Sequence, residues 1–171
     1  MAPAFDVLAT PVFANNAIGF GSNCPVVSDT LLVIDETLLL FPIAECAWSL
    51  PYNTTARSLS ATLVLNVKPV VVPVATTTTV RIALYVANNI TAPNLFVPTS
   101  FALDFVIPAG APPLVTSLYF QDQVSGFESF STGQRLLLLA SVVPTNGTLS
   151  ILGTGVQVSA GLGTQPNGPF F

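Results

Sequence analysis

The feature that most constrains the fold of this chain is an unbroken apolar run near its C-terminal end. Residues 135–143 read Arg-Leu-Leu-Leu-Leu-Ala-Ser-Val-Val, and a turn sequence, Pro-Thr-Asn-Gly, follows at 144–147. A second strand pattern, interrupted by glycines, occupies 148–161. A strand that is apolar on both faces must be covered on both faces. Because 171 residues leave little material for such cover, we expect other copies of the same chain to supply it.

Charged residues are scarce, and this scarcity bears on function. The chain has eight acidic and four basic residues, whereas average usage would give about 43 charges at this length. A monomer of this mass exposes about 8,000 Å² of surface, which so few charges cannot hydrate well. We therefore expect a surface that is buried in an assembly and coated with Ser, Thr, Asn and Gln. Four basic residues cannot neutralise a phosphate backbone, which argues against a nucleic-acid partner.

The composition favours strands and turns. The hydrophobic content is 51%, yet no apolar run approaches the roughly 20 residues of a spanning helix. The longest candidate runs are broken by Pro42, Pro69, Pro73 and Pro144. Fifteen prolines, eleven glycines and many Val and Thr residues are typical of β-structure. We predict no membrane span.

Period-two alternation of apolar residues predicts individual strands. Residues 58–67, 76–86, 101–107 and 114–120 all show it. No helical pattern separates the strands, and turn signals recur at all-β spacing. We predict an all-β fold of about eight to ten antiparallel strands. Three polar or turn-rich stretches are predicted as loops, turns or tail: 88–94, 121–133 and 164–171.

The residues that most enzymes need are missing or scattered. The chain has no histidine, so Ser-His-Asp and Cys-His arrangements are impossible. The eight acids are dispersed, apart from the adjacent Asp35 and Glu36, and no phosphate-binding loop is present. We therefore predict a protein that is not an enzyme, with no catalytic, cofactor-binding or metal-binding residues and no cofactor.

Four groups of residues are candidates for structural or interface roles. Cys24 and Cys46 could pair with each other, pair between chains, or stay reduced. Residues 1–14 are apolar and could form an edge strand, a frayed terminus, or an arm that docks on a neighbouring subunit. The C-terminal aromatics could pack locally or on a partner. Two strand arginines could face solvent or form inter-subunit ion pairs. The residues concerned are Phe5, Val7, Leu8, Val12 and Phe13 in the arm, Phe170 and Phe171 at the C-terminus, and Arg81 and Arg135 in strands.

Several short segments, taken in order, resemble a known family. They are 18–22 (Ile-Gly-Phe-Gly-Ser), 46–51 (Cys-Ala-Trp-Ser-Leu-Pro), 58–61, 82–86, 135–139 and 158–162. Together they resemble the C-terminal domain of the Bacillus collagen-like glycoprotein of the exosporium, over residues 15–163. The resemblance implies a jelly-roll of the tumour-necrosis-factor and complement-head type, assembled as a tight homotrimer on the spore surface. It also implies no enzymatic activity and synthesis without a secretion signal, and residues 1–6 lack a basic signal region.

The chain departs from that family because the collagen stalk and the exosporium-targeting leader are absent. A short apolar arm, residues 1–14, takes their place, followed by the jelly-roll at 15–163 and a tail at 164–171. The chain could be an excised domain, or a stalkless subunit whose arm inserts into the next trimer and builds a fibre or spore appendage. The anchoring partner is unknown. The alternatives are a trimeric binding head that recognises carbohydrate or a receptor through loops 88–99 and 121–133, and a viral capsid or fibre-head jelly-roll.

Overall fold

The structure, a computed structural model, is entirely β within the residues that it describes. Those residues are 4–5, 15–18, 23–26, 34–35, 46–67, 78–88, 91–107, 118–144 and 154–167. They form eleven strands and no helix. The six long strands are β6 (Thr54–Val67), β7 (Thr78–Asn88), β8 (Ala92–Ile107), β9 (Leu118–Phe130), β10 (Arg135–Pro144) and β11 (Thr154–Pro166). The five short strands are β1 (Ala4–Phe5), β2 (Asn15–Ile18), β3 (Asn23–Val26), β4 (Ile34–Asp35) and β5 (Trp48–Ser49).

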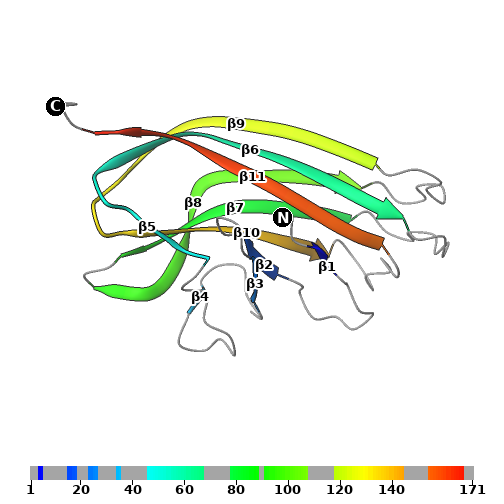
Figure 1. The fold of residues 1–171 in the computed structure, drawn as a ribbon, viewed down its shortest axis with the longest axis horizontal. Helices are drawn as coiled ribbons and strands as arrows, with labels where there is room; N and C mark the ends of the chain where they lie inside the picture. Colours follow the sequence, from blue (N-terminus) through cyan, green and yellow to red (C-terminus); the bar gives the residue numbers. More distant parts are fainter. Residues whose placement is uncertain are drawn as a thin grey trace.

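The strands form two antiparallel sheets. The first sheet has the order β1-β11-β6-β9, and the second has the order β3-β2-β10-β7-β8-β4, with β5 also paired to β10. Figure 1 shows β9 and β6 in the upper part of the view and β7 and β10 below them, while β11 crosses the view from the upper left to the lower right. The predicted all-β, antiparallel fold is confirmed for the described residues.

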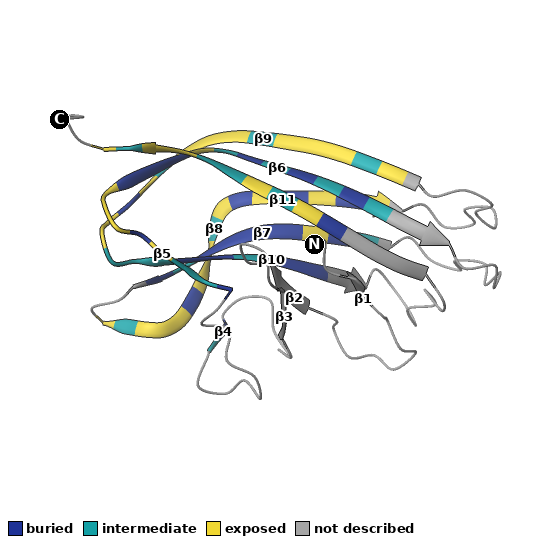
Figure 2. Ribbon diagram, in the orientation of Figure 1, coloured by how far each residue is buried: buried dark blue, intermediate teal, exposed yellow. Residues whose placement is uncertain are grey.

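The predicted alternation is visible in the burial of side chains. On β6, Leu59, Ala61 and Leu63 are buried, while the residues between them are half-buried. On β8, Phe101, Leu103 and Phe105 are buried and the residues between them are exposed, as Figure 2 shows by colour. Each strand therefore directs one row of apolar side chains into the space between the sheets.

The main core lies between the two sheets. It draws apolar side chains from both sheets, so the sheets pack face to face as in a β-sandwich. Its buried members include Leu59 and Leu63 from the first sheet and Ile82, Leu84 and Phe101 from the second. These residues, which are at most 2% exposed, each contribute roughly 1.5–3 kcal/mol through burial.

A second apolar cluster covers the other face of the second sheet and corrects one prediction. Leu137 and Leu139, on the outer face of β10, are each 1% exposed in the single chain. They belong to a cluster that includes Ile34, Cys46 and Phe96 of the same chain. The expectation that other copies cover both faces of this run is therefore wrong for these residues. The reason is that Ile34, Cys46 and the partly buried Ala47 of the same chain pack in this cluster with them.

The loop predicted at 121–133 is wrong for residues 121–130, and the turn predicted at 88–94 is shorter than expected. The tail predicted at 164–171 begins within a strand, and its residues 168–171 lie outside the described part. Residues 121–130 belong to β9, residues 92–94 begin β8, and β11 continues through Pro166. The polarity that suggested loops has a different cause in β9. It is an edge strand of the first sheet among the described strands, so its outer side chains and much of its inner row face water. Only Val124 and Phe130 among residues 121–130 give the apolar alternation, which is too sparse to indicate a strand.

Glycine permits two local features at the ends of β9. Gly126 lies against the Phe101 ring, and a Cβ atom placed on it would come within 2.9 Å of Phe101 Cζ. Gly133 has a positive φ of 82° in the turn between β9 and β10. Its N–H donates to the Leu50 carbonyl at 2.8 Å, which ties this turn to the segment that leads into β6. A side chain at either position would meet steric resistance.

Candidate functional site

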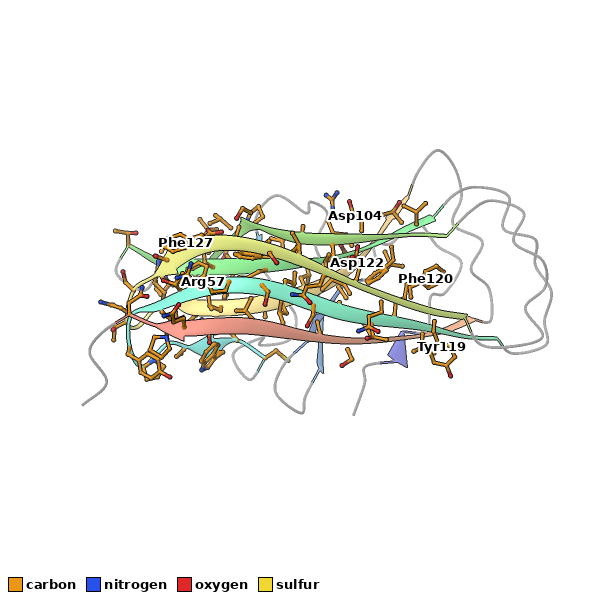
Figure 3. The ribbon with its side chains drawn as sticks, turned by 90° about the horizontal axis from the view of Figure 1, so that it is seen from above. Arg57, Asp104, Tyr119, Phe120, Asp122 and Phe127 are labelled. Carbon is orange, nitrogen blue, oxygen red and sulfur yellow. The ribbon has the colours of Figure 1, made fainter. Side chains whose placement is uncertain are left out.

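The surface most suited to contact another molecule is the outer face of β9. Alternate residues of this strand, which we call the β9 outer row, point away from the core and are all exposed: Tyr119, Gln121, Gln123, Ser125, Phe127 and Ser129. Tyr119 is 73% exposed and Phe127 is 65% exposed. Figure 3 shows these two aromatic side chains at opposite ends of the strand. The row combines two aromatic rings with uncharged hydroxyl and amide groups, a pattern typical of contact surfaces.

Arg57 lies beside this row and is held by neighbours in its own chain. Its Cζ atom is 4.5 Å from the centroid of the Phe127 ring, within the range of a cation–π contact. Its Nε and Nη2 atoms donate to Gln165 Oε1 at 3.3 and 3.0 Å. The guanidinium therefore links β9 and β11 across β6. The strand pairing is irregular at this point, since the register of β6 with β9 shifts between Ala56 and Ser58.

The two acids of β9 also have partners in the chain. Glu128 Oε2 accepts hydrogen bonds from Ser100 N at 3.1 Å and from Ser100 Oγ at 2.8 Å. Because Ser100 lies on β8, this contact joins β9 of the first sheet to β8 of the second. Asp122 Oδ1 accepts the Gln123 N–H at 2.8 Å. Neither carboxylate is aimed at a common point with other acids.

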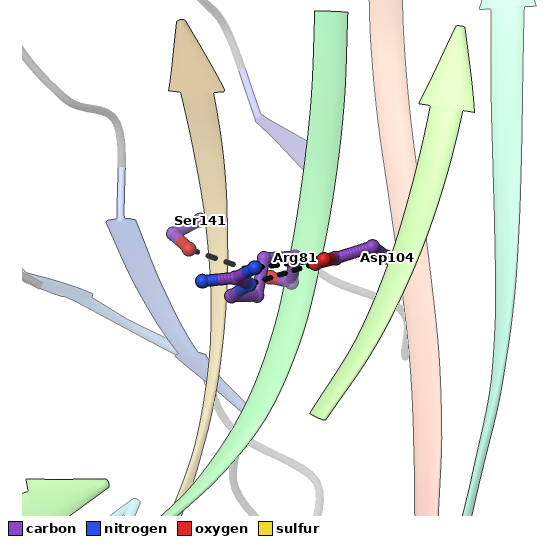
Figure 4. Close-up of polar contacts among 3 residues, drawn as sticks. All are labelled: Arg81, Asp104 and Ser141. Carbon is purple, nitrogen blue, oxygen red and sulfur yellow. Dashed lines mark hydrogen bonds and ion pairs between the residues drawn. The ribbon is translucent and has the colours of Figure 1, made fainter. Parts of the chain in front are cut away.

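Arg81, a predicted interface charge, forms an ion pair within the chain. Its Nε and Nη2 donate to Asp104 Oδ1 and Oδ2, both at 2.7 Å, in the bidentate geometry of Figure 4. These hydrogen bonds lower the pKa of the Asp104 carboxyl and raise the pKa of the Arg81 guanidinium. The Ser141 hydroxyl donates to the Arg81 carbonyl at 3.4 Å from the next strand. The pair bridges β7 and β8.

Arg135, the other predicted interface charge, is also engaged locally. Its Nη1 donates to the Pro93 carbonyl at 3.3 Å, and its Cζ atom lies 5.1 Å from the centroid of the Phe96 ring. Both arginines therefore have partners in the same chain. The predicted inter-subunit role of these residues stays a prediction.

Cys46 is buried at 4% exposure and is disulfide-bonded. The backbone of Cys24, the other cysteine of the sequence, lies in β3 opposite Ala17. The Cys24 side chain lies outside the described part of the structure, so the pairing of these two cysteines stays a prediction.

The predicted docking residues fall largely outside the described residues. The backbone of Phe5 lies in β1, opposite Val156 of β11. Its side chain is outside the described part, as are Val7, Leu8, Val12, Phe13, Phe170 and Phe171. Their docking role stays a prediction.

The described residues contain no group of three or more His, Cys, Asp or Glu side chains that could hold a metal ion. Over the same part of the chain there is no helix that is long and apolar enough to cross a membrane. No protein-family model matches the chain, and comparison with curated proteins finds no match.

The β9 outer row is the surface that the sequence interpretation missed. Its residues fall at every second position from 119 to 129, which is the signal that could have revealed it. Because the intervening inner positions include Asp122, Gly126 and Glu128, the stretch resembles a polar loop. Only the pairing with β6 shows that it is a strand.

Proposed function

We propose that this chain is a non-enzymatic structural protein of the bacterial spore surface, in the exosporium or a spore appendage. In this proposal the antiparallel sandwich is a jelly-roll that assembles as a homotrimer, and the N-terminal arm joins trimers into a fibre. Two antiparallel sheets with a shared core agree with the fold that the family resemblance implies. The resemblance itself supplies the spore surface and the trimer.

The observation that carries the self-assembly part of this proposal is how the few charges are used. Every charged side chain of the described part interacts within the chain: Asp35, Arg57, Arg81, Asp104, Asp122, Glu128 and Arg135. Hydroxyl, amide and aromatic groups therefore make up most of the remaining strand surface. A surface of this kind holds its hydration water less strongly than a charged one, so it suits contact with copies of the chain.

The arm part of the proposal is supported by the position of β1. Ala4 and Phe5 pair antiparallel with Gln157 and Val156, which adds a strand to the β11 edge of the first sheet. Nine residues, 6–14, separate this short strand from β2 in the other sheet. The same pairing made with a neighbouring copy would link subunits, as in domain-swapped assemblies.

The experiment that tests the proposal combines size measurement with localisation. We expect light scattering after gel filtration to give a mass of three or more chains of 17.8 kDa, and negative-stain images to show trimers or fibres. Immunogold labelling of spores should place the protein on their surface. A monodisperse monomer would overturn the assembly, and labelling confined to the spore interior would overturn the location.

A further inference from the structure

We propose that β9 is a self-pairing edge through which two copies of this chain join. In this arrangement β9 of one copy pairs antiparallel with β9 of a second copy around a two-fold axis at Val124. The first sheets of the two copies then form one continuous sheet. The inference rests on the self-association part of the proposed function and does not depend on the spore surface, the trimer or the arm.

The backbone of β9 is available for this pairing. Within the described residues its strand neighbour is β6, so one side of this 13-residue strand has no ladder partner. In an antiparallel sheet about half of the backbone N–H and C=O groups of an edge strand point outward. An open edge of this length is a template for another strand.

The strand also lacks most of the devices that protect sheet edges. It contains no proline, lysine or arginine, and the irregularity in its pairing with β6 is confined to residues 126–127. Natural edge strands that avoid association commonly carry such residues, and lysine above all. Its two charges are acidic, and Glu128 is drawn toward Ser100 on β8. The edge is thus long and nearly uncharged.

The sequence of β9 is complementary to itself about Val124. Residues equally distant from Val124 on its two sides then lie opposite one another, so each of the 13 positions has a counterpart in the second copy. In the outer row, Gln123 lies opposite Ser125 of the second copy, Gln121 opposite Phe127, and Tyr119 opposite Ser129. Each aromatic ring of the outer row therefore lies opposite a polar side chain, and the third pair joins an amide to a hydroxyl.

Charge disfavours two neighbouring registers, and a third, with the axis at Gln123, pairs only 11 of the 13 positions. With the axis at Val124, Asp122 faces Gly126 of the second copy and Glu128 faces Phe120. Moving the axis to Ser125 would place Asp122 opposite Glu128, and moving it to Asp122 would place that carboxylate opposite its own copy. Like charges directly opposite one another destabilise a sheet. An axis midway between two residues would set the outer row of one copy against the inner row of the other.

The same register covers the exposed aromatic rings. Tyr119 of one copy becomes the diagonal neighbour of Phe127 of the second copy, and the contact occurs twice because of the two-fold axis. Diagonal neighbours on one face of a sheet are about 7–8 Å apart, within reach of aromatic side chains. The two most exposed aromatic residues of the described part, at 73% and 65%, would thereby gain a partner.

The test is a charge exchange at the two positions that flank the axis. The double variant Gln123→Lys/Ser125→Lys places lysine opposite lysine twice, and Gln123→Glu/Ser125→Glu places glutamate opposite glutamate twice. We expect each variant alone to dimerise about tenfold more weakly than the unmodified chain, or worse. An equimolar mixture should restore dimers, because each lysine then faces a glutamate. Sedimentation velocity measures all three samples.

A matched control adds the same charges elsewhere on the same sheet face. Ser159→Lys/Gly161→Lys alters two exposed positions of β11, spaced as on β9, and a Cβ at Gly161 makes only an ordinary contact, 3.6 Å from Ser60 Oγ. We expect its self-association to match that of the unmodified chain. Circular dichroism checks the fold of each variant. Hydrogen exchange on the unmodified chain is independent of substitution, and amides 118–130 should become more protected as concentration rises.

The outcomes separate the two proposals. Restored dimers in the mixture support the β9 pairing. Association of the charged variants equal to that of the unmodified chain overturns the pairing and leaves self-assembly standing. Loss that mixing does not restore, or equal loss in the control, also overturns it, as does concentration-independent protection of β9. An unmodified chain that stays monomeric overturns both this inference and the proposed assembly.

Discussion

At the scale of single residues, Gly126 determines how closely the edge strand approaches the core. A Cβ atom there would lie 2.9 Å from Phe101 Cζ and 3.0 Å from Phe101 Cε1, and Phe101 is 1% exposed with no room to retreat. We predict that Gly126→Ala lowers the free energy of unfolding by about 1–3 kcal/mol, the cost of overpacking a core. Chemical denaturation measures this loss.

Gly161→Ala is the control for that prediction. Its added methyl group meets only Ser60 Oγ, at 3.6 Å, so the free energy of unfolding should change by less than about 0.5 kcal/mol. Adding Phe101→Leu to Gly126→Ala should recover part of the loss, since the smaller side chain makes space. Equal losses for both alanine variants would show that glycine flexibility, and not the Phe101 contact, decides the effect.

The Arg81–Asp104 pair predicts a pH dependence of stability. The Asp104 pKa is lowered by its hydrogen bonds from Arg81, so the pair stabilises the fold fully above the unfolded pKa of about 4. The contribution is lost as pH falls through the lower folded pKa. Because the side chains are 44% and 40% exposed, we predict that Asp104→Asn costs only about 0.5–1 kcal/mol at pH 7.

Urea denaturation from pH 7 to pH 2 measures this difference between the unmodified chain and Asp104→Asn. The difference should stay constant down to about pH 5 and shrink below about pH 4. Asp122→Asn removes an equal charge that has no ion pair within the described residues, and it should cost less than about 0.5 kcal/mol at pH 7. A difference for Asp104→Asn that persists at pH 2 would contradict the assignment.

At the scale of elements, β6, β7 and β8 could be predicted from the period-two alternation of their apolar residues, and β10 from its unbroken apolar run. The strand β9 could not, because it lies at an edge and half of its inner row is polar or glycine. Its assignment depends on pairing with β6, which is distant in sequence. The period-two alternation of apolar residues identifies strands that bury one face. It fails for a strand whose inner face is partly exposed to solvent.

The same limit applies to the candidate site. The sequence predicts Arg81 as a strand charge that faces solvent or pairs with another subunit, but it does not show which residue of the same chain lies opposite. The register of β7 with β8 places Arg81 opposite Asp104, after a turn that was predicted to be longer. Partners of charged strand residues depend on register. Register depends on turn length and on burial of one face, which local patterns specify weakly here.

Because β10 is buried on both faces, a truncated side chain on either face should lower the stability of the fold. Leu136 packs in the core between the sheets, and Leu137 packs in the second cluster under segments of the same chain. We predict that Leu136→Ala and Leu137→Ala each lower the free energy of unfolding by about 2–5 kcal/mol. Leu95→Ala, at a residue that is 36% exposed, should cost less than about 1 kcal/mol.

Urea denaturation at protein concentrations about a hundredfold apart measures these losses of stability. It also tests whether Leu137 is covered by its own chain or by a neighbouring copy. If the chain covers Leu137 itself, the loss for Leu137→Ala is the same at both concentrations. A loss that appears only at the higher concentration would mean that neighbouring copies form the cover.

At the scale of the whole molecule, the scarcity of charge sets the kind of force that can hold an assembly together. The charges of the described strands are used within the chain, so the contacts that these strands would make with other copies rely on backbone hydrogen bonds, amides and aromatic rings. Such contacts are not screened by ions, whereas exposed ion pairs are. Salt therefore distinguishes contacts between subunits from contacts within them.

We predict that self-association changes less than about threefold between roughly 0.05 and 1 M sodium chloride, because screening acts only on charges. Sedimentation velocity across this range gives the dissociation constant. The Arg81–Asp104 pair is an internal reference in the same buffers, since the stability cost of Asp104→Asn should shrink as salt rises. If association weakens tenfold or more while that cost also shrinks, the prediction is contradicted. Ion pairs between subunits would then contribute to association.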